Sequence, residues 1–204
     1  MAKRIVIIGE DGDIVVKIAR GRSEVRVSEK DVNDVKLLIS KNLIPQMEIR
    51  VESVFRPGKE DVETCYALSG NDVLTNHHKF ASSQVIKEAT PLEIHTKTEA
   101  KVRQIMEETF DSGLPSTVVD VHTHPGGVAE LSPQDLSANA NAYRVYSKFF
   151  RNVYFAVHAV SEEGKFRRSK PEVRENRIRW SSINREHEVA FYDVNGKPVE
   201  VQIV

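Results

Sequence analysis

The sequence has little of what marks secreted and membrane proteins. It contains one cysteine, Cys65, in 204 residues, which excludes an intrachain disulfide and favours a reducing compartment. No stretch approaches the roughly 18 to 20 consecutive apolar residues that a membrane helix needs. The apolar run at residues 5–8 is too short for a signal-peptide core, and no small-residue cleavage site follows it. We therefore expect a cytoplasmic protein that makes no contact with a membrane.

The sequence also lacks an excess of charge of either sign. The 29 Lys and Arg and the 30 Asp and Glu leave a net charge of −1, so the chain as a whole is not an electrostatic nucleic-acid binder. Residues 164–185 are the exception, with eight basic and two acidic side chains, or +6 against −7 for the remainder. Such a run is typical of a solvated face. A docking surface for an acidic partner is the alternative, and a nucleic-acid site is a distant third.

Several short β-type patterns open the chain. Residues 4–19 have two β-branched runs around a Glu-Asp-Gly-Asp turn and predict a hairpin, and Glu24–Val27 predicts a further strand. A helix start resembling a capping box follows at Ser28–Asp31. Apolar residues then recur at helical spacing up to Ile39, so we expect a helix that ends near Asn42, before Pro45. Past the proline, Met47, Ile49 and Val51 alternate as in a strand.

Helices and strands then interleave through the rest of the chain. Residues 63–69 predict a buried strand, 74–96 short strands and a long loop, and 98–111 an amphipathic helix. We further expect strands at 118–121 and 153–160, a helix at 135–147, and a C-terminal hairpin on the Asn195-Gly196 turn. This interleaving indicates one α/β domain with a mixed sheet. Residues 1–204 would form this domain, with the hairpin 4–19 and the basic segment 164–185 as elaborations.

One stretch carries chemistry: residues 118–136, VVDVHTHPGGVAELSPQDL. Side chains two residues apart in a strand face the same side, so His122 and His124 can aim both imidazoles at one point. The Pro-Gly-Gly that follows forces the chain to turn at once. Ser132-Pro-Gln-Asp135 then has the pattern of a helix N-terminus with serine as the cap. This turn would return Asp135 to the end of the strand.

Two imidazoles and one carboxylate form the ligand set of a catalytic zinc site, which keeps its fourth position open to water. Zinc bound in this way lowers the pKa of water to about 7. Taken alone, Ser-Pro-x-Asp is an ordinary helix cap and His-x-His is a weak signal. The conjunction is specific, because the cap would position the third ligand. Cys65 offers an alternative: as a fourth ligand it would close the site and make the zinc structural, although a lone cysteine in an apolar strand is usually a small buried hydrophobe.

These residues resemble the motif of the JAMM (MPN+) metalloproteases, a distant Glu followed by His-Ser/Thr-His, seven residues and Ser-x-x-Asp. HTHPGGVAELSPQD matches it without a gap. The Pro-Gly and the leucine before the serine are most similar to the member of the family in the proteasome lid. The resemblance covers Val25 to about Val160. It implies a single MPN domain, a mixed and mainly antiparallel curved sheet flanked by helices, similar to cytidine deaminases.

The resemblance also implies roles for particular residues. His122, His124 and Asp135 would hold Zn²⁺, and Ser132 would donate a hydrogen bond to the oxyanion. The family's upstream glutamate, which acts as general base, begins a strand of the form Glu-x-x-x-Leu-Leu-x-Gly, and Glu63-Thr-Cys-Tyr-Ala-Leu-Ser-Gly70 fits this register. The other candidates for the base are Glu52 and Glu60. Residues 45–58 depart from the family pattern, because they look inserted before this strand.

The implied activity is that of a metallo-isopeptidase of the deubiquitinase type. It would hydrolyse the amide bond between the C-terminal glycine of a ubiquitin-like modifier and a lysine. The expected partners are conjugates of ubiquitin or a ubiquitin-like protein, with a proteasome-like particle or a partner MPN subunit as further candidates. An archaeal or bacterial single-domain member fits the size. Alternatives are linear processing of a ubiquitin-like or sulfur-carrier precursor, and a scaffold module of the same fold that does not use zinc.

The remaining histidines have simpler interpretations. His77 and His78 lie in a polar stretch and are expected to be exposed to solvent. His158, within VYFAVHAV, is most simply a hydrogen-bonded histidine of the core or of a sheet end. His95 and His187 carry no usable signal.

Overall fold

The computed structural model describes residues 4–8, 14–18, 24–27, 36–53, 63–84, 89–162 and 164–204. The chain divides into two compact units, Met1–Lys36 and Leu37–Val204. We describe each unit by itself. In the described part of the chain, no helix is both long and apolar enough to cross a membrane.

The first unit contains a three-stranded antiparallel sheet in the order β1-β2-β3. Strand β1 (Arg4–Ile8) pairs with β2 (Ile14–Ile18), with Arg4 opposite Ile18. Strand β3 (Glu24–Val27) pairs with β2 on its other side. The predicted hairpin and the predicted third strand are therefore both confirmed.

The second unit is built on a nine-stranded sheet in the order β12-β4-β6-β5-β7-β8-β11-β10-β9. The pairings are mainly antiparallel, and the β12–β4, β4–β6 and β7–β8 pairs are parallel. The strands are β4 (Leu37–Ile39), β5 (Thr64–Gly70), β6 (Val73–Gln84), β7 (Thr117–Pro125), β8 (Asn152–Val160), β9 (Glu172–Arg174), β10 (Arg177–Ser181), β11 (Glu186–Tyr192) and β12 (Val201–Ile203). The predicted mixed α/β fold, with a mainly antiparallel sheet, is confirmed at this level.

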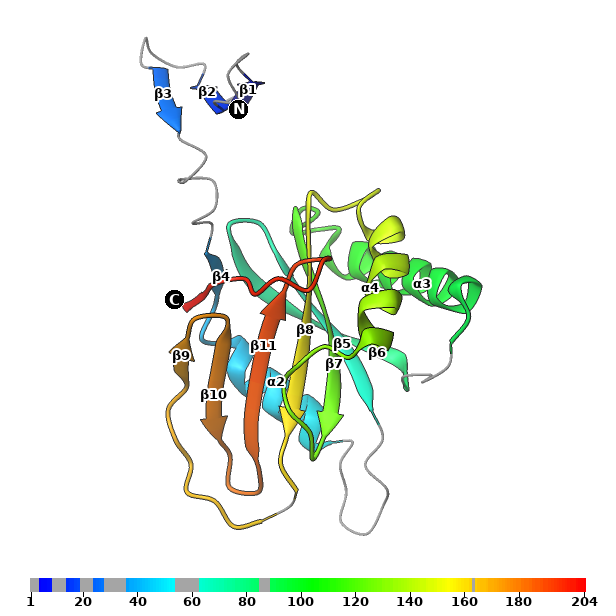
Figure 1. Cartoon of the computed structure of the whole chain (residues 1–204), viewed down its shortest axis with the longest axis vertical. Helices are drawn as coiled ribbons and strands as arrows, with labels where there is room; N and C mark the ends of the chain where they lie inside the picture. Colours follow the sequence, from blue (N-terminus) through cyan, green and yellow to red (C-terminus); the bar gives the residue numbers. More distant parts are fainter. Residues whose placement is uncertain are drawn as a thin grey trace. The chain divides into compact units, whose positions relative to one another are not determined.

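The sheet curves until its two ends meet. The amide of Val201, in β12, donates a hydrogen bond of 3.0 Å to the carbonyl of Glu175, which directly follows β9. Strands β7, β8 and β11 lie at the centre (Figure 1). The sheet is therefore nearly closed, with one face turned inward and one outward.

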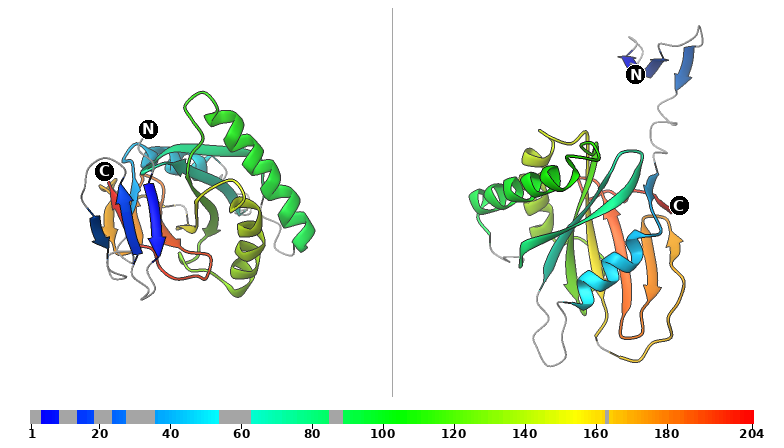
Figure 2. Two further views of the ribbon diagram at one scale, coloured as in Figure 1. Left: turned by 90° about the horizontal axis from the view of Figure 1, so that it is seen from above. Right: turned by 180° about the vertical axis from the view of Figure 1, so that it is seen from behind.

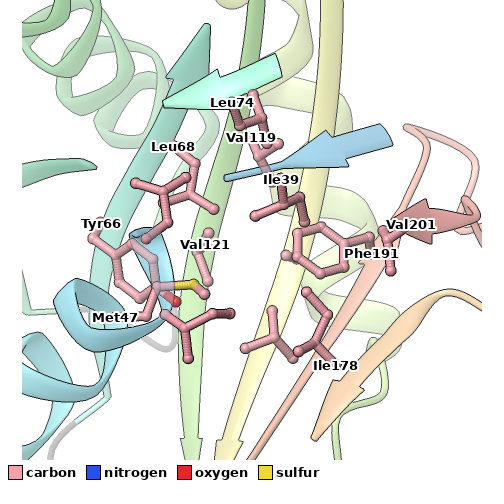
Figure 3. Packing of buried hydrophobic residues seen from close by; sticks show 14 of the residues in the cluster. Ile39, Met47, Tyr66, Leu68, Leu74, Val119, Val121, Ile178, Phe191 and Val201 are labelled. Atoms are coloured by element: carbon pink, nitrogen blue, oxygen red, sulfur yellow. The ribbon is translucent and has the colours of Figure 1, made fainter. Parts of the chain in front are cut away.

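Each face of the sheet is covered by helices. Helix α2 (Leu43–Glu52) covers the first face, as the rear view shows (Figure 2). Its Met47 packs with Tyr66, Val121 and Phe191 of the strands in one apolar cluster (Figure 3). Helices α3 (Pro91–Thr109) and α4 (Pro133–Tyr146) cover the other face, where their buried side chains form a second cluster with the strands, made of Cys65, Ala67, Phe80, Val102, Ile105, Val118, Ala142, Val145, Tyr146, Phe150, Val153 and Phe155.

Two predictions around Pro45 were wrong. Leu37–Ile39 forms strand β4 instead of the end of a helix, and residues 28–35 lie outside the described residues. The alternating residues of 47–51 belong to helix α2. Pro45 lies in the first turn of this helix, where an amide has no intrahelical acceptor, so proline is tolerated there. The buried face, which includes Leu43, Met47 and Val51, follows the helical spacing of four residues.

Other boundaries also differ from the sequence-based expectation. Residues 73–84 form one long strand, and α3 begins at Pro91, earlier than the predicted helix at 98–111. The earlier start comes from a capping box between Thr90 and Glu93. The strands expected at 63–69 and 153–160 are confirmed as β5 and β8. The C-terminal hairpin is short: Tyr192 bridges Pro198, and the chain then joins β4 as β12.

Candidate metal centre

The two histidines of the motif lie on β7, which runs through the motif to Pro125. Val119 and Val121 of this strand are fully buried in the cluster under α2. The alternation of the strand turns His122 and His124 to the opposite face, toward α4. Their Nε2 atoms are 3.1 Å apart. The predicted convergence of the two imidazoles is present.

Asp135 reaches the same point from the start of α4. Ser132 is the N-cap, and its Oγ accepts a hydrogen bond of 3.2 Å from the Asp135 amide. In return, the Ser132 amide donates a hydrogen bond of 2.8 Å to Asp135 Oδ2. This reciprocal cap fixes the carboxylate, with Oδ1 3.2 Å from His122 Nε2 and Oδ2 3.6 Å from His124 Nε2. The cap and the ligand function are therefore compatible in one residue.

The spacing of these atoms fits a metal ion. One ligand atom each from His122, His124 and Asp135 lies within 4.8 Å of the other two. A tetrahedral zinc with metal–nitrogen bonds of about 2.0–2.1 Å separates its ligand atoms by about 3.3 Å, close to the distances given above. The three side chains are 14%, 20% and 20% exposed, so the group is accessible to solvent on one side. The group can hold a metal ion.

The main chain orients His124. Its Nδ1 donates a hydrogen bond of 3.1 Å to the Val128 carbonyl, so the lone pair lies on Nε2. The carbonyl is presented by the Pro-Gly-Gly turn, in which Gly126 has a φ of +60° and donates 2.7 Å to the Val160 carbonyl. Sequence reasoning missed this partner of His124. The Pro-Gly-Gly signal indicated the turn but not which carbonyl it would offer.

The electrostatics of the group favour an ionised carboxylate. Burial alone would raise the pKa of Asp135, but hydrogen bonds from His122 and His124 lower it well below its usual range. Conversely, the hydrogen bond to Asp135 raises the pKa of His124, although burial opposes this shift. Without a metal ion, Asp135 and His124 therefore stabilise each other's charged forms.

Glu63 lies beside this group. The last ladder pair between β5 and β7 places Cys65 opposite His122. The ladder ends at this pair, and the next amide, that of Thr64, donates 2.8 Å to the Thr123 side chain, so Glu63 comes just before Thr64 next to the end of β7 that carries His124. The negative charge of Glu63 also contributes to the raised pKa of His124. The structure therefore brings the predicted general base next to the three predicted ligands.

Cys65 does not close the site. In the described part of the chain, the ligand group consists of His122, His124 and Asp135 only. Burial raises the pKa of the Cys65 thiol, with Lys101 opposing the shift. Lys101 itself binds both oxygens of Asp120, at 2.8 and 2.9 Å. The thiol therefore packs beside an ion pair instead of offering a thiolate to a metal.

The other candidate bases are not placed at this site. Glu52 lies on α2, where it accepts a hydrogen bond from the Ser182 hydroxyl and is 3.8 Å from His187 Nε2. This is the opposite face of the sheet. Glu60 lies outside the described residues.

The prediction for His77 and His78 was wrong. His78 is 2% exposed, and its ring bonds the Ser69 hydroxyl and the Glu108 carboxylate. His77 stacks on Tyr66 with ring centroids 4.9 Å apart. Both histidines lie in the long strand β6, where His78 is on the buried face and His77 is only partly exposed. The prediction for His158 is confirmed, since it is fully buried and bonds Tyr66 and His187.

The chain matches no known protein-family model and has no significant match among curated proteins. The case for the site therefore rests on its own geometry. Three potential ligands converge at a strand end and a helix cap, with Glu63 beside them.

Proposed function

We propose that the protein is a zinc-dependent isopeptidase. One observation carries this proposal: His122, His124 and Asp135 converge with an accessible side. The end of the β5–β7 ladder next to His122, two residues from Glu63, supports Glu63 as the base. Two imidazoles and a carboxylate suit zinc, and three protein ligands leave a position for water. The likeness of the motif to the JAMM metalloproteases supports amide hydrolysis as the reaction.

In this proposal each residue has one task. His122, His124 and Asp135 hold the zinc ion, which when bound supplies a Lewis acid that activates water and polarises a carbonyl. Glu63 accepts the proton of the attacking water and returns it to the leaving amine. The Ser132 oxygen accepts a hydrogen bond from the Asp135 amide. The hydroxyl proton of Ser132 therefore remains available to donate to the developing oxyanion.

We propose as substrate the amide bond between the C-terminal glycine of a ubiquitin-like modifier and a lysine. The motif resemblance supports this substrate, and β6 is compatible with it. Strand β4 pairs with β6 only at Val73 and Leu74 among the described strands, so most of the outer edge of β6 remains for an extended tail. β6 ends at Gln84, opposite Thr64 and one residue from Glu63. Two carbonyls of β6 already accept side-chain hydrogen bonds: that of Lys79 from Gln104 and that of Phe80 from Arg50.

The test begins with zinc content per chain and cleavage of lysine-linked diubiquitin with and without a chelator. We expect one zinc per chain and cleavage that the chelator abolishes. Glu63→Gln should keep the zinc and lose about 100-fold or more in turnover, because the proton acceptor is removed. Glu52→Gln is the matched control, since Glu52 lies on the other face, and it should retain activity.

Other results would redirect or end the proposal. A protein that binds the modifier without cleaving it is a scaffold module, and one that cleaves only linear fusions is a precursor-processing enzyme. Full activity in Glu63→Gln would place the general base elsewhere. Absence of metal binding would end the proposal.

A further inference from the structure

Thr123, the residue between the two histidines, has a hydrogen bond that links the strand of the metal ligands to the strand of Glu63. It is fully buried, and strand alternation turns its side chain to the face opposite the two histidines. Its Oγ1 accepts a hydrogen bond of 2.8 Å from the amide of Thr64. The residue therefore contacts the main chain next to Glu63 from behind the sheet.

This bond lies where the main-chain ladder ends. The last ladder pair of β5 and β7 is Cys65 with His122. At the next position, the Thr123 hydroxyl accepts a hydrogen bond from the Thr64 amide. Glu63 is the residue that immediately precedes Thr64. A second contact reaches Thr64 from α2, where Arg50 donates 3.2 Å to the Thr64 side chain. The first contact ties Thr64 to the strand of the metal ligands, and the second ties it to a helix.

We infer that Thr123 is a positioning residue that, through the Thr64 amide, holds Glu63 near His124. This inference rests on the proposed function, in which Glu63 transfers the proton. Such a transfer requires heavy atoms within about 2.6–3.2 Å, and a displacement of about 1 Å can cost on the order of 100-fold in rate. Thr64 is buried, so its amide would be left as an unsatisfied buried donor if the Thr123 hydroxyl were removed. We expect the end of the strand to shift until the amide reaches another acceptor.

Thr123→Val tests this inference because it removes the hydroxyl and keeps the shape of the side chain. With lysine-linked diubiquitin as the probe, we expect kcat to fall about 10- to 100-fold. KM should stay within about twofold, because the modifier is bound elsewhere. Zinc should remain at one per chain, and Thr123→Ser should restore kcat. Thr123→Ala provides the same comparison if valine does not pack.

Thr117→Val is the matched control. Thr117 is a buried threonine at the other end of β7, and its hydroxyl donates to the Asn71 carbonyl and accepts from Asn152. We expect this variant to lose stability and keep kcat within about twofold. Equal loss of kcat in both valine variants would overturn the inference in favour of a general effect on the sheet.

A second measurement does not depend on turnover. In protein loaded with Co²⁺ and labelled with ¹³C in Glu63, the carboxylate signal carries a paramagnetic shift that depends on its distance from the metal. We expect Thr123→Val to reduce this shift, while Thr123→Ser and Thr117→Val keep it. An unchanged shift with unchanged kcat in Thr123→Val would overturn the inference. Wild-type protein that binds cobalt but cleaves nothing would count against the proposed function, and the shift would still test the role of Thr123.

Discussion

Two pairs of histidines lie on opposite faces of the same sheet. The ring nitrogens are equally far apart in both pairs, but the two pairs have different hydrogen-bond partners. His122 and His124 have Nε2 atoms 3.1 Å apart, and Asp135 joins them. On the face under α2, His158 Nε2 and His187 Nδ1 are also 3.1 Å apart. The second pair does not belong to a ligand group in the described part of the chain. Proximity of imidazoles is therefore not enough to make a metal site.

The direction of the hydrogen bonds explains the difference. Under α2, a Glu52 oxygen lies 3.8 Å from His187 Nε2, beyond hydrogen-bond distance. If His187 carries its proton on Nε2, its Nδ1 accepts from His158 Nε2, and His158 Nδ1 accepts from the Tyr66 hydroxyl at 2.9 Å. Both nitrogens of His158 are used within this chain. His124, by contrast, uses only Nδ1 for a carbonyl, so that in its neutral form the lone pair of Nε2 is left for a metal ion shared with Asp135.

The largest expected effect separates the two pairs by metal binding. His124→Ala should lower zinc affinity by well over 100-fold, because it removes a ligand. Loss of a residue that only orients a ligand typically lowers metal affinity by about 10- to 100-fold. His158→Phe should retain one zinc per chain and lower the free energy of unfolding by about 2–4 kcal/mol, because it leaves buried polar partners unpaired. Zinc titration and chemical denaturation measure both. Zinc loss in His158→Phe would contradict the separation of the two sites.

An intermediate effect concerns pH in the metal-free protein. Burial lowers the pKa of His187 from 6.5 to about 4, so below pH 6.5 the unfolded chain binds a proton that the folded chain refuses. The free energy of unfolding should fall as pH drops from about 6.5 to 4, by on the order of 3 kcal/mol for this residue. His124 has the opposite sign: its pKa is raised, so its contribution is present at low pH and is lost as pH rises through the folded value.

Denaturation of chelated protein between pH 7 and pH 4 tests these opposite signs. His187→Gln should make the decline shallower than in wild type, and His124→Gln should make it steeper. The remaining decline in His187→Gln would come from His77, whose pKa burial also lowers to about 4, and from His158. Identical pH profiles for the two variants would contradict the assigned environments.

The smallest expected effect concerns the turn that presents the Val128 carbonyl to His124. Gly126→Ala should cost about 1 kcal/mol in stability, because its φ of +60° disfavours a side chain. It should also lower zinc affinity by about 3- to 10-fold through the displaced carbonyl. Gly113→Ala is the control: its φ is +92°, and both sites have open space for a Cβ. Gly113→Ala should lower stability by a similar amount and leave zinc affinity unchanged. An equal loss of zinc affinity in both variants would show that the Pro-Gly-Gly turn does not support His124.

Much of the candidate metal centre was predictable because its signals are local. His122 and His124 share a strand face through their spacing of two residues, and Ser132 and Asp135 share one helix cap. The same applies to the hairpin of β1 and β2. The assignment of residues 47–51 failed because a short apolar run allows both periods, and burial against Tyr66 and Phe191 decided for the helix.

The sequence alone determined which side chains can act as ligands and that the strand end and the helix cap would carry them. Only the tertiary structure decided that Glu63 enters the sheet next to the end of β7, that the Val128 carbonyl accepts from His124, that the Thr123 hydroxyl accepts from Thr64, and that His78 is buried. The physical reason is range. Side-chain direction and capping are set within a few residues, whereas strand register and burial depend on partners far away in the chain.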